Sequence, residues 1–172
     1  MKVRIKFRKF GIVRFIGHLD VMRFFQKAIR RAEIDIAYTA GFNPHQVMSF
    51  AAPLGVGLES NGEYMDIELQ SLESSKSLVD RLNAVCVEGI EILSAKVLPE
   101  DAGNAMASVA AASYTIRFRE GREPNFTYLD KLEHFFASPQ ILIQKTTKRS
   151  TLEIDLKAGI YKLYAKEGNI YM

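Results

Sequence analysis

Two short segments of the sequence carry polar residues of the types used in acid–base chemistry. One reads Gly-His-Leu-Asp and supplies His18 and Asp20, and the other reads Gly-Phe-Asn-Pro-His and supplies Asn43 and His45. A histidine can accept or release a proton near neutral pH, and a neighbouring carboxylate can orient its ring. His18, His45 and Asp20 are therefore candidate catalytic residues, provided that the fold brings the two segments together.

Binding without catalysis is an alternative role for the same segments. Arg23, one turn after Asp20, and the free amides at the start of a helix would favour a phosphate group. Asn43, His45 and Ser49 could supply hydrogen bonds to a ligand. In a purely structural alternative, Asp20 caps a helix and the Asn-Pro pair only shapes a loop. The candidate residues do not have the spacing of a metal-binding motif, so we expect no metal site.

A row of basic residues follows the first segment at helical spacing. Arg23, Lys27 and Arg30 recur at i, i+4 and i+7, and Arg31 lies beside them. Residues 1–50 carry a net charge of +7, whereas the remaining residues carry −4. Such a surface is compatible with a polyanion such as RNA, so these four side chains are candidate phosphate contacts. A simply solvated helix face is the alternative.

Cysteine content and hydropathy exclude several classes of protein. Cys86 is the only cysteine, which leaves no internal disulfide, no zinc site of paired thiolates and no iron–sulfur cluster held by this chain alone. It stands in an apolar stretch and is expected in the core. The sequence has no run of about eighteen apolar residues that could span a membrane, and its first residues lack the apolar stretch of a secretory signal. We therefore expect a cytoplasmic protein that binds no cofactor itself.

The hydropathy pattern predicts the elements that would position these side chains. Alternation of charged and aliphatic residues predicts a strand over 2–9, and an apolar stripe of helical period predicts a helix over 18–33. Further strands are predicted over 34–39, 63–70 and 90–98, and a second helix over 74–86. The order strand–helix–strand–strand–helix–strand is that of a ferredoxin-like domain, in which two helices cover one antiparallel sheet.

The chain is expected to contain two such units, which makes the fold α+β with tandem ferredoxin-like (βαββαβ) units and antiparallel sheets. The first unit spans 1–99 and carries both polar segments, and 100–112 forms a connector of small residues. The second spans 113–172, with strands predicted over 114–119, 141–145, 152–156 and 161–165 and a helix over 128–137. Because the sequence ends in a strand-like stretch, this second unit is expected to be incomplete.

In a ferredoxin-like unit the two polar segments would meet. The first leaves the end of strand 2–9, and the second, which opens a turn-rich connection over 41–62, leaves the end of strand 34–39. Since these two strands run parallel, both segments would emerge at the same edge of the sheet. We therefore expect one site formed by the polar side chains of both segments, namely His18, Asp20, Asn43 and His45. On the open face, the basic residues of strand 2–9 are expected to pair with the acids of strand 63–70.

Four stretches of the sequence, two of which contain the polar segments described above, resemble a known family. They read Phe-Ile-Gly-His-Leu-Asp-Val-Met-Arg over 15–23, Tyr-Thr-Ala-Gly-Phe-Asn-Pro-His over 38–45, Pro-Leu-Gly-Val-Gly-Leu-Glu-Ser over 53–60 and Glu-Tyr-Met-Asp-Ile over 63–67. Together and in this order they are similar to a bacterial radical-SAM-linked domain family of unknown function. Its members look like partners or fusions of B12-type radical-SAM proteins. They usually extend beyond the point where this sequence ends.

The resemblance implies an accessory protein of a radical-SAM enzyme, with no catalytic activity of its own. S-adenosylmethionine and the iron–sulfur cluster would belong to the partner, because one cysteine cannot hold a cluster. The chain would bind RNA, either tRNA or rRNA, or the partner enzyme itself. Two alternatives remain open. The protein could be a metal-independent RNA endonuclease with His18 or His45 as the base, or an adaptor that docks other proteins through 41–62.

Overall fold

The computed structural model describes residues 1–126, 128–147 and 150–172. It divides into two compact units, Met1–Ala110 and Ala111–Met172. The described residues form four α-helices and three antiparallel sheets, which confirms the α+β class. None of the described helices is long and apolar enough to cross a membrane.

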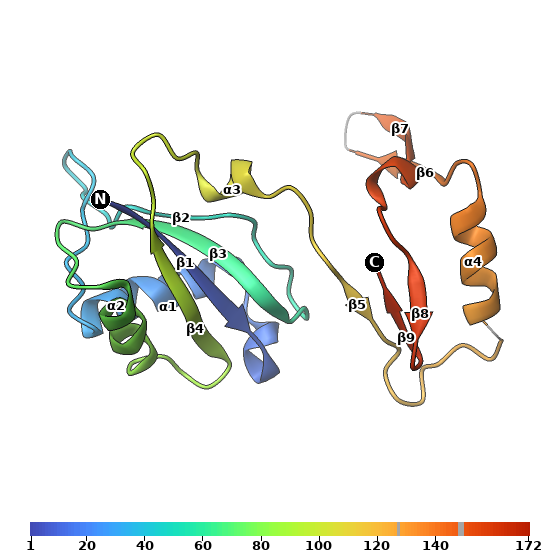
Figure 1. Cartoon of the computed structure of the whole chain (residues 1–172), viewed down its shortest axis with the longest axis horizontal. Helices are drawn as coiled ribbons and strands as arrows, with labels where there is room; N and C mark the ends of the chain where they lie inside the picture. The colour runs from blue at the N-terminus through green and yellow to red at the C-terminus, as the bar shows by residue number, and fades with distance from the viewer. Residues whose placement is uncertain (127, 148–149) are drawn as a thin grey trace. The chain divides into compact units, whose positions relative to one another are not determined.

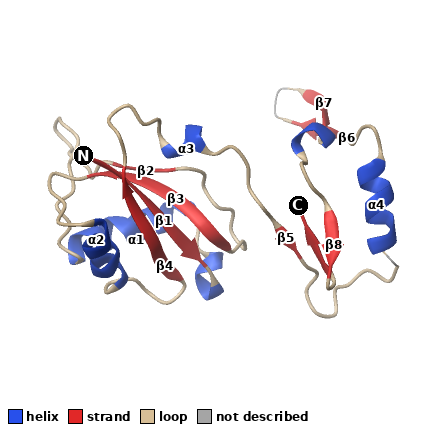
Figure 2. Ribbon diagram, viewed as in Figure 1, coloured by secondary structure: helices blue, strands red, loops and turns tan. Residues whose placement is uncertain are grey.

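A four-stranded antiparallel sheet forms the centre of the first unit (Figures 1 and 2). Its strands, in spatial order, are β2 (Met48–Phe50), β3 (Ser60–Glu68), β1 (Lys2–Lys9) and β4 (Ile90–Val97). Two helices, α1 (His18–Arg31) and α2 (Ser75–Asn83), lie side by side against this sheet (Figure 1). A short 3-10 helix, η1 (Gly11–Phe15), joins β1 to α1.

Alternation along β1 decides which of its side chains enter the core. Val3, Ile5 and Phe7 are buried, while the basic residues between them are only partly covered. The ring of Phe7 meets that of Phe25 in α1 edge-on, with the ring centroids 4.8 Å apart. Burial of these apolar side chains stabilises the packing of α1 on the sheet.

The opposite face of the sheet carries a paired charge and is crossed by the chain after β4. Arg4 forms a two-pronged ion pair with Asp66 of β3, with nitrogen–oxygen distances of 2.8 and 3.0 Å. Hydrogen bonding to this carboxylate raises the pKa of the guanidinium. Arg4 also donates to the carbonyl oxygen of Gly103 at 3.0 Å, and α3 (Ala105–Ser108) contacts β2 and β3. The predicted pairing between β1 and β3 is therefore confirmed at Arg4.

The second strand of the sheet lies elsewhere than the sequence predicted. Residues 34–39 form isolated bridges, in which Ile36 pairs with Leu69 and Tyr38 with Gln46. The strand that pairs with β3 is β2, which falls inside the predicted 41–62 connection. Alternating polarity fits either segment, and both pack against the core, Ile36 from one and Met48 and Phe50 from the other. The ladder along β3 is formed by β2, whereas residues 34–39 reach only its end, where Ile36 pairs with Leu69.

The described residues of the second unit form one α-helix, α4 (Leu129–Ala137), a short 3-10 helix, η2 (Lys157–Gly159), and two small sheets. One sheet has the order β5 (Thr115–Ile116), β9 (Asn169–Tyr171) and β8 (Tyr164–Lys166), and the other pairs β6 (Leu142–Thr146) with β7 (Thr151–Asp155). This order of elements differs from that of the first unit, so the predicted tandem repeat is not confirmed. Strands this short enclose little core, and Ile141 is the one buried side chain among the described residues of this unit.

Candidate functional site

His18 and His45 lie toward opposite ends of the sheet in the first unit. Both β1 and β2 run antiparallel to β3 and therefore point the same way. His18 follows the end of β1, whereas His45 precedes the start of β2. The expected convergence fails because the second strand begins after His45 and does not end before it. The structure therefore does not bring the two histidines together.

His45 closes an exposed loop that precedes β2. Its backbone N–H donates to Thr39 Oγ1 at 3.1 Å, and its carbonyl oxygen accepts from the Thr39 N–H at 2.9 Å. Its Nδ1 lies 3.1 Å from Thr39 Oγ1 and 3.4 Å from the carbonyl oxygen of Asn43. The next residue, Gln46, is buried and donates to the carbonyl oxygen of Gln26 in α1. These contacts make Gly-Phe-Asn-Pro-His a loop-closing segment anchored to the middle of α1.

His18 is the first residue of α1 and packs against the end of β2. Its ring meets that of Phe50 edge-on, with the centroids 5.0 Å apart. Both rings line a hollow of about 10 Å³, together with Lys9 and Glu63. A hollow of this volume has room for at most about one water molecule. Ser49, next to Phe50, is exposed and lies outside this lining.

Lys9 is a group that the sequence analysis missed at this site. Only 2% of the residue is exposed, and its ammonium donates to the carbonyl oxygens of Ile16 at 2.9 Å and Arg14 at 3.4 Å. Burial lowers the pKa of this ammonium, and the nearby charge of Glu63 acts in the opposite direction. The signal was present in the alternation of β1, because position 9 has the same parity as the buried positions 3, 5 and 7.

Further contacts fasten the loop after β2 to η1. The backbone N–H of Gly57 donates to the carbonyl oxygen of Arg14 at 2.8 Å. The Arg14 guanidinium pairs with Glu59 at 2.8 Å, and the same carboxylate accepts from the N–H of Gly11 at 3.1 Å. Gly57 has a φ of +88°, a conformation that glycine adopts at little cost. The Gly-Val-Gly segment and the segment that opens α1 therefore meet at one junction.

Five large apolar side chains around this junction are exposed. Their exposed fractions are 80% for Ile12, 64% for Val56, 60% for Leu19, 53% for Phe15 and 52% for Leu58. Ile12 and Phe15 lie within two residues of Arg14, and Val56 and Leu58 are next to Gly57, so the hydrogen bond from Gly57 to Arg14 brings these two pairs close together. Leu19 lies in the first turn of α1, which follows η1. We call these five residues the apolar surface. Exposed apolar side chains gathered in this way are typical of interaction sites.

The predicted phosphate contacts are all exposed along α1. Arg23 pairs with Asp20 at 3.3 Å, with both side chains more than half exposed. Lys27 and Arg30 continue the row, and within the described ranges neither takes part in an ion pair. Arg31 turns away and donates to a backbone carbonyl oxygen that follows α2. Lys27 and Arg30 are therefore the cations of the row that remain available to an anion.

Neither a metal site nor a reactive thiol emerges from the described part of the chain. It holds no group of three or more His, Cys, Asp or Glu side chains placed to bind a metal ion. Cys86 packs half-buried against the core, and burial raises the pKa of its thiol to about 11, with Arg31 acting weakly in the opposite direction. Such a thiol is almost wholly protonated at neutral pH and is poorly suited to act as a nucleophile.

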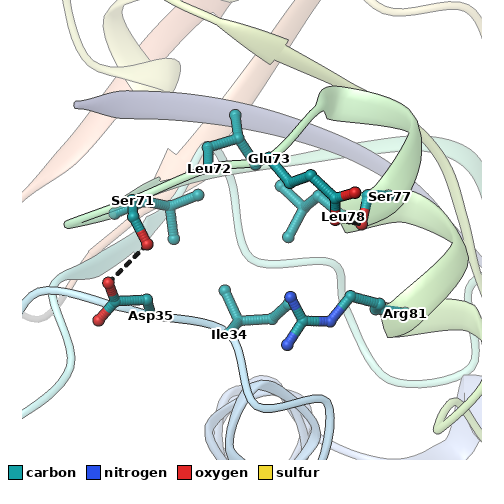
Figure 3. Close-up of a pocket in the computed structure, with 9 residues that line it drawn as sticks. Ile34, Asp35, Ser71, Leu72, Glu73, Ser77, Leu78 and Arg81 are labelled. Atoms are coloured by element: carbon teal, nitrogen blue, oxygen red, sulfur yellow. Dashed lines mark hydrogen bonds between the residues drawn. The ribbon is translucent and has the colours of Figure 1, made fainter.

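A larger cavity, of about 50 Å³, lies between the end of α1 and the start of α2 (Figure 3). On one side Ser71 donates to the carboxylate of Asp35 at 2.7 Å (Figure 3). On the other, the Arg81 guanidinium donates to the carbonyl oxygens of Ala32 and Glu33 just after α1. These polar groups are satisfied within the unit, and none of the sequence-predicted site residues lines the cavity. We interpret it as a packing gap at the helix junction.

Comparison with known proteins places the whole chain in one group. A search of curated proteins finds none that matches it. A protein-family model, in contrast, matches residues 2–172 and so covers both units. On the extent of that match, the chain belongs to the family DUF2344, whose description is "uncharacterized protein conserved in bacteria".

Proposed function

We propose that the protein is a non-catalytic accessory protein that docks on a radical-SAM enzyme through the apolar surface. The observation that supports this proposal is the exposure of five large apolar side chains around the junction of η1, α1 and the loop after β2. Protein partners bury such side chains, because removal of apolar area from water favours association. The identity of the partner rests on the family resemblance of the sequence.

Charges around the apolar surface indicate the chemistry of the docking partner. The nearby acids, Glu59 and Asp20, each pair with an arginine. Beyond them, α1 continues with the exposed cations Lys27 and Arg30, which form no ion pair with any residue that the structure describes. A complementary surface would be apolar at its centre and acidic at its rim. In this proposal S-adenosylmethionine and the iron–sulfur cluster are bound by the partner, and both proteins act in the cytoplasm.

Titration of the full chain against the radical-SAM protein of the same organism tests the proposal. We expect association that weakens only modestly with salt, because apolar burial dominates it and salt screens only the charges at the rim. Replacing an exposed residue of the apolar surface, as in Phe15→Ser or Leu19→Ser, should weaken association at least about tenfold, the loss expected when one buried apolar contact is removed. Phe42→Ser is the matched control, because Phe42 is fully exposed and lies outside the apolar surface.

The expected changes are specific enough to be contradicted. Equal affinity for the wild type and the two apolar-surface variants would refute docking through this surface. A fall in affinity for Phe42→Ser of the same size would show that the effect is not confined to the surface. Since Phe15 and Leu19 are exposed, their variants should unfold at the same denaturant concentration as the wild type.

RNA binding through α1 is a second candidate function, favoured by the exposure of Lys27 and Arg30, for which the described residues supply no acidic partner. Contacts between these cations and phosphates would make the affinity fall with salt, with a slope of about 0.7 per phosphate contact for single strands. Lys27→Ala and Arg30→Ala should each reduce the slope. Lys76→Ala removes another exposed lysine, which pairs with Asp80 within α2, and should not reduce it. A wild-type affinity for RNA that does not respond to salt would contradict this candidate.

We also propose that the first unit is ferredoxin-like. Its element order of strand–helix–strand–strand–helix–strand and its strand order β2-β3-β1-β4 support this assignment. Histidine-dependent RNA cleavage remains a prediction from the sequence, and the separation of His18 and His45 means that each would have to act alone.

A further inference from the structure

The sheet of the second unit carries a pair of stacked tyrosines on one face. Tyr164 of β8 and Tyr171 of β9 are direct partners across the two strands. Their rings lie nearly parallel, with the centroids 5.2 Å apart and an interplanar angle of 13°. Thr115 of β5 is the partner of Tyr171 on its other side, so these three residues form a row across the sheet. About half of Tyr164 is exposed.

Exposed cations lie in and beside the strands that carry this pair. Side chains two positions apart in a strand share a face, which places Lys166 on the face of Tyr164. Lys162 lies two residues before β8, and Arg117 follows directly after β5, so both flank the sheet at the ends of its strands. All three cations are exposed. The ammonium of Lys166 lies 3.8 Å from the carboxylate of Glu167. Because both side chains are exposed, this ion pair is weak and leaves Lys166 able to contact a phosphate. In the described part of the chain, Lys162 and Arg117 take part in no ion pair.

The other face of the same sheet has a different character. Ala165 and Ile170 are partners across β8 and β9, and Ile116 of β5 is the next partner of Ile170. This row is entirely apolar, although Ala165 and Ile116 are exposed. The face with the tyrosines and Lys166 is therefore the polar face of the sheet, the one suited to contact with a charged ligand.

We infer that the tyrosine face of the second unit binds a single-stranded nucleic acid. Bases would stack on the exposed ring of Tyr164 and its partner Tyr171, while the backbone phosphates would contact Lys162, Lys166 and Arg117. Aromatic rings with cations close by have this use, since every base presents a flat face and every nucleotide a phosphate. A duplex hides its bases in the stack and offers the rings no partner. This inference does not depend on the proposed docking function, because the two use different units.

Binding is tested with the full chain and fluorescently labelled oligonucleotides. The probes are a single-stranded RNA of about twelve uridines, the corresponding DNA and a duplex RNA of the same length. Both single strands should bind more tightly than the duplex, and their relative affinity tells whether the natural ligand is RNA or DNA. Tyr164→Leu should weaken single-strand binding at least about fivefold, the lower end of the effect of one stacked base. Tyr164→Phe keeps the ring and should stay within about twofold of the wild type.

Matched variants separate stacking from a structural effect of the tyrosine pair. Tyr161→Leu removes a more exposed tyrosine outside β8 and should leave the affinity unchanged. The double variant Lys162→Ala/Lys166→Ala should reduce the salt dependence without changing the unfolding curve, so it tests the face even if Tyr164→Leu unfolds the sheet. The chain contains seven tyrosines and no tryptophan, so stacking should also quench its tyrosine emission, and less so in Tyr164→Phe/Tyr171→Phe.

Three outcomes would overturn the inference. They are equal affinity for duplex and single strand, unchanged affinity in the double lysine variant, and loss of binding in Tyr161→Leu as large as in Tyr164→Leu. Phe15→Ser, which tests docking, should leave oligonucleotide affinity unchanged. Lys27→Ala, which tests RNA contact by α1, should leave the tyrosine quenching unchanged. Failure of either function proposed for the first unit is thus distinguishable from failure of this one.

Discussion

The ammonium nitrogen of Lys9 donates a hydrogen bond to the carbonyl oxygen of Ile16 at 2.9 Å, from a side chain that is almost completely buried. Lys9 is the last residue of β1, and Ile16 follows η1 just before α1 begins. The contact therefore ties the end of a core strand to the connection that carries the apolar surface. A buried charge is costly unless hydrogen bonds satisfy it, so the carbonyl oxygens of η1 are an integral part of this arrangement.

Shortening Lys9 should destabilise the first unit. Lys9→Ala removes the buried aliphatic part of the side chain and leaves the carbonyl oxygens of Arg14 and Ile16 without their donor. We therefore expect the free energy of unfolding to fall by about 2–5 kcal/mol, as for other large-to-small changes in a core. Lys9→Met keeps most of the volume and should lose less. Urea unfolding of the two variants and the wild type measures the difference. Equal losses in both variants would show that the buried aliphatic part contributes nothing.

The stability difference between the wild type and Lys9→Met should depend on pH. Burial lowers the pKa of Lys9 in the folded state below its ordinary value of 10.5. Between the lowered and the ordinary value, the unfolded chain binds more protons than the folded one, so the stability of the wild type rises with pH in that window. Unfolding free energies measured from pH 8 up to 10.5 should therefore move in favour of the wild type. A difference that stays constant would contradict the burial of a charged Lys9.

The ion pair between Arg4 and Asp66 should contribute more than any exposed pair of the first unit. Asp66 is 4% exposed, and its removal in Asp66→Ala leaves the guanidinium with an unpaired charge. We expect Asp66→Ala to lower the free energy of unfolding by about 3–5 kcal/mol. The double variant Arg4→Met/Asp66→Ala should lower it by less than the sum of the two single changes. Arg8→Ala breaks the exposed pair with Glu91 and should cost at most about 1 kcal/mol. Additive losses in the double variant would refute the coupling.

Hydropathy was sufficient to predict the helices of the first unit. The prediction for the first helix, 18–33, compares with α1 at His18–Arg31, and the prediction for the second, 74–86, with α2 at Ser75–Asn83. In both helices, the apolar side chains at helical spacing form the face that packs against the sheet. The second strand could not be located in this way, because 34–39 and 48–50 both offer alternating polarity and both pack against the core. Only the pairing with β3 distinguishes them.

The candidate site was less accessible to sequence reasoning than the fold. The prediction placed the second strand before His45, whereas β2 begins after it. This one wrong strand position explains why His18 and His45, which were expected to meet, lie apart. Lys9 could have been found, because strand parity alone assigns it to the buried face. The apolar surface could not, since its members come from η1, α1 and a loop, and no single period links them.

Gly89 should not tolerate a side chain. Its φ is +98°, and a Cβ atom would lie 2.5 Å from Val13 Cγ2 and 2.7 Å from the carbonyl oxygen of Phe10. Gly89→Ala should therefore cost at least about 1 kcal/mol through backbone strain and displace η1. Gly103→Ala is the control, because nothing lies within 4 Å of its Cβ position and its φ is not positive. Thermal unfolding of both variants measures the effect, and equal midpoints would contradict the predicted overlap.

Cys86 should react slowly with thiol reagents, because burial raises the pKa of its thiol from 9.0 to about 11. At pH 8 this leaves about a hundredfold less thiolate than an ordinary cysteine would have, and the reaction rate should climb steadily as the pH rises toward 11.

The raised pKa of Cys86 also makes the free energy of unfolding depend on pH. Between pH 9 and 11 the unfolded chain releases the thiol proton while the folded chain keeps it, so stability falls as pH rises through this window. Cys86→Ala should remove that part of the fall. A reaction at pH 8 as fast as that of the urea-unfolded chain would show that Cys86 is neither buried nor shifted.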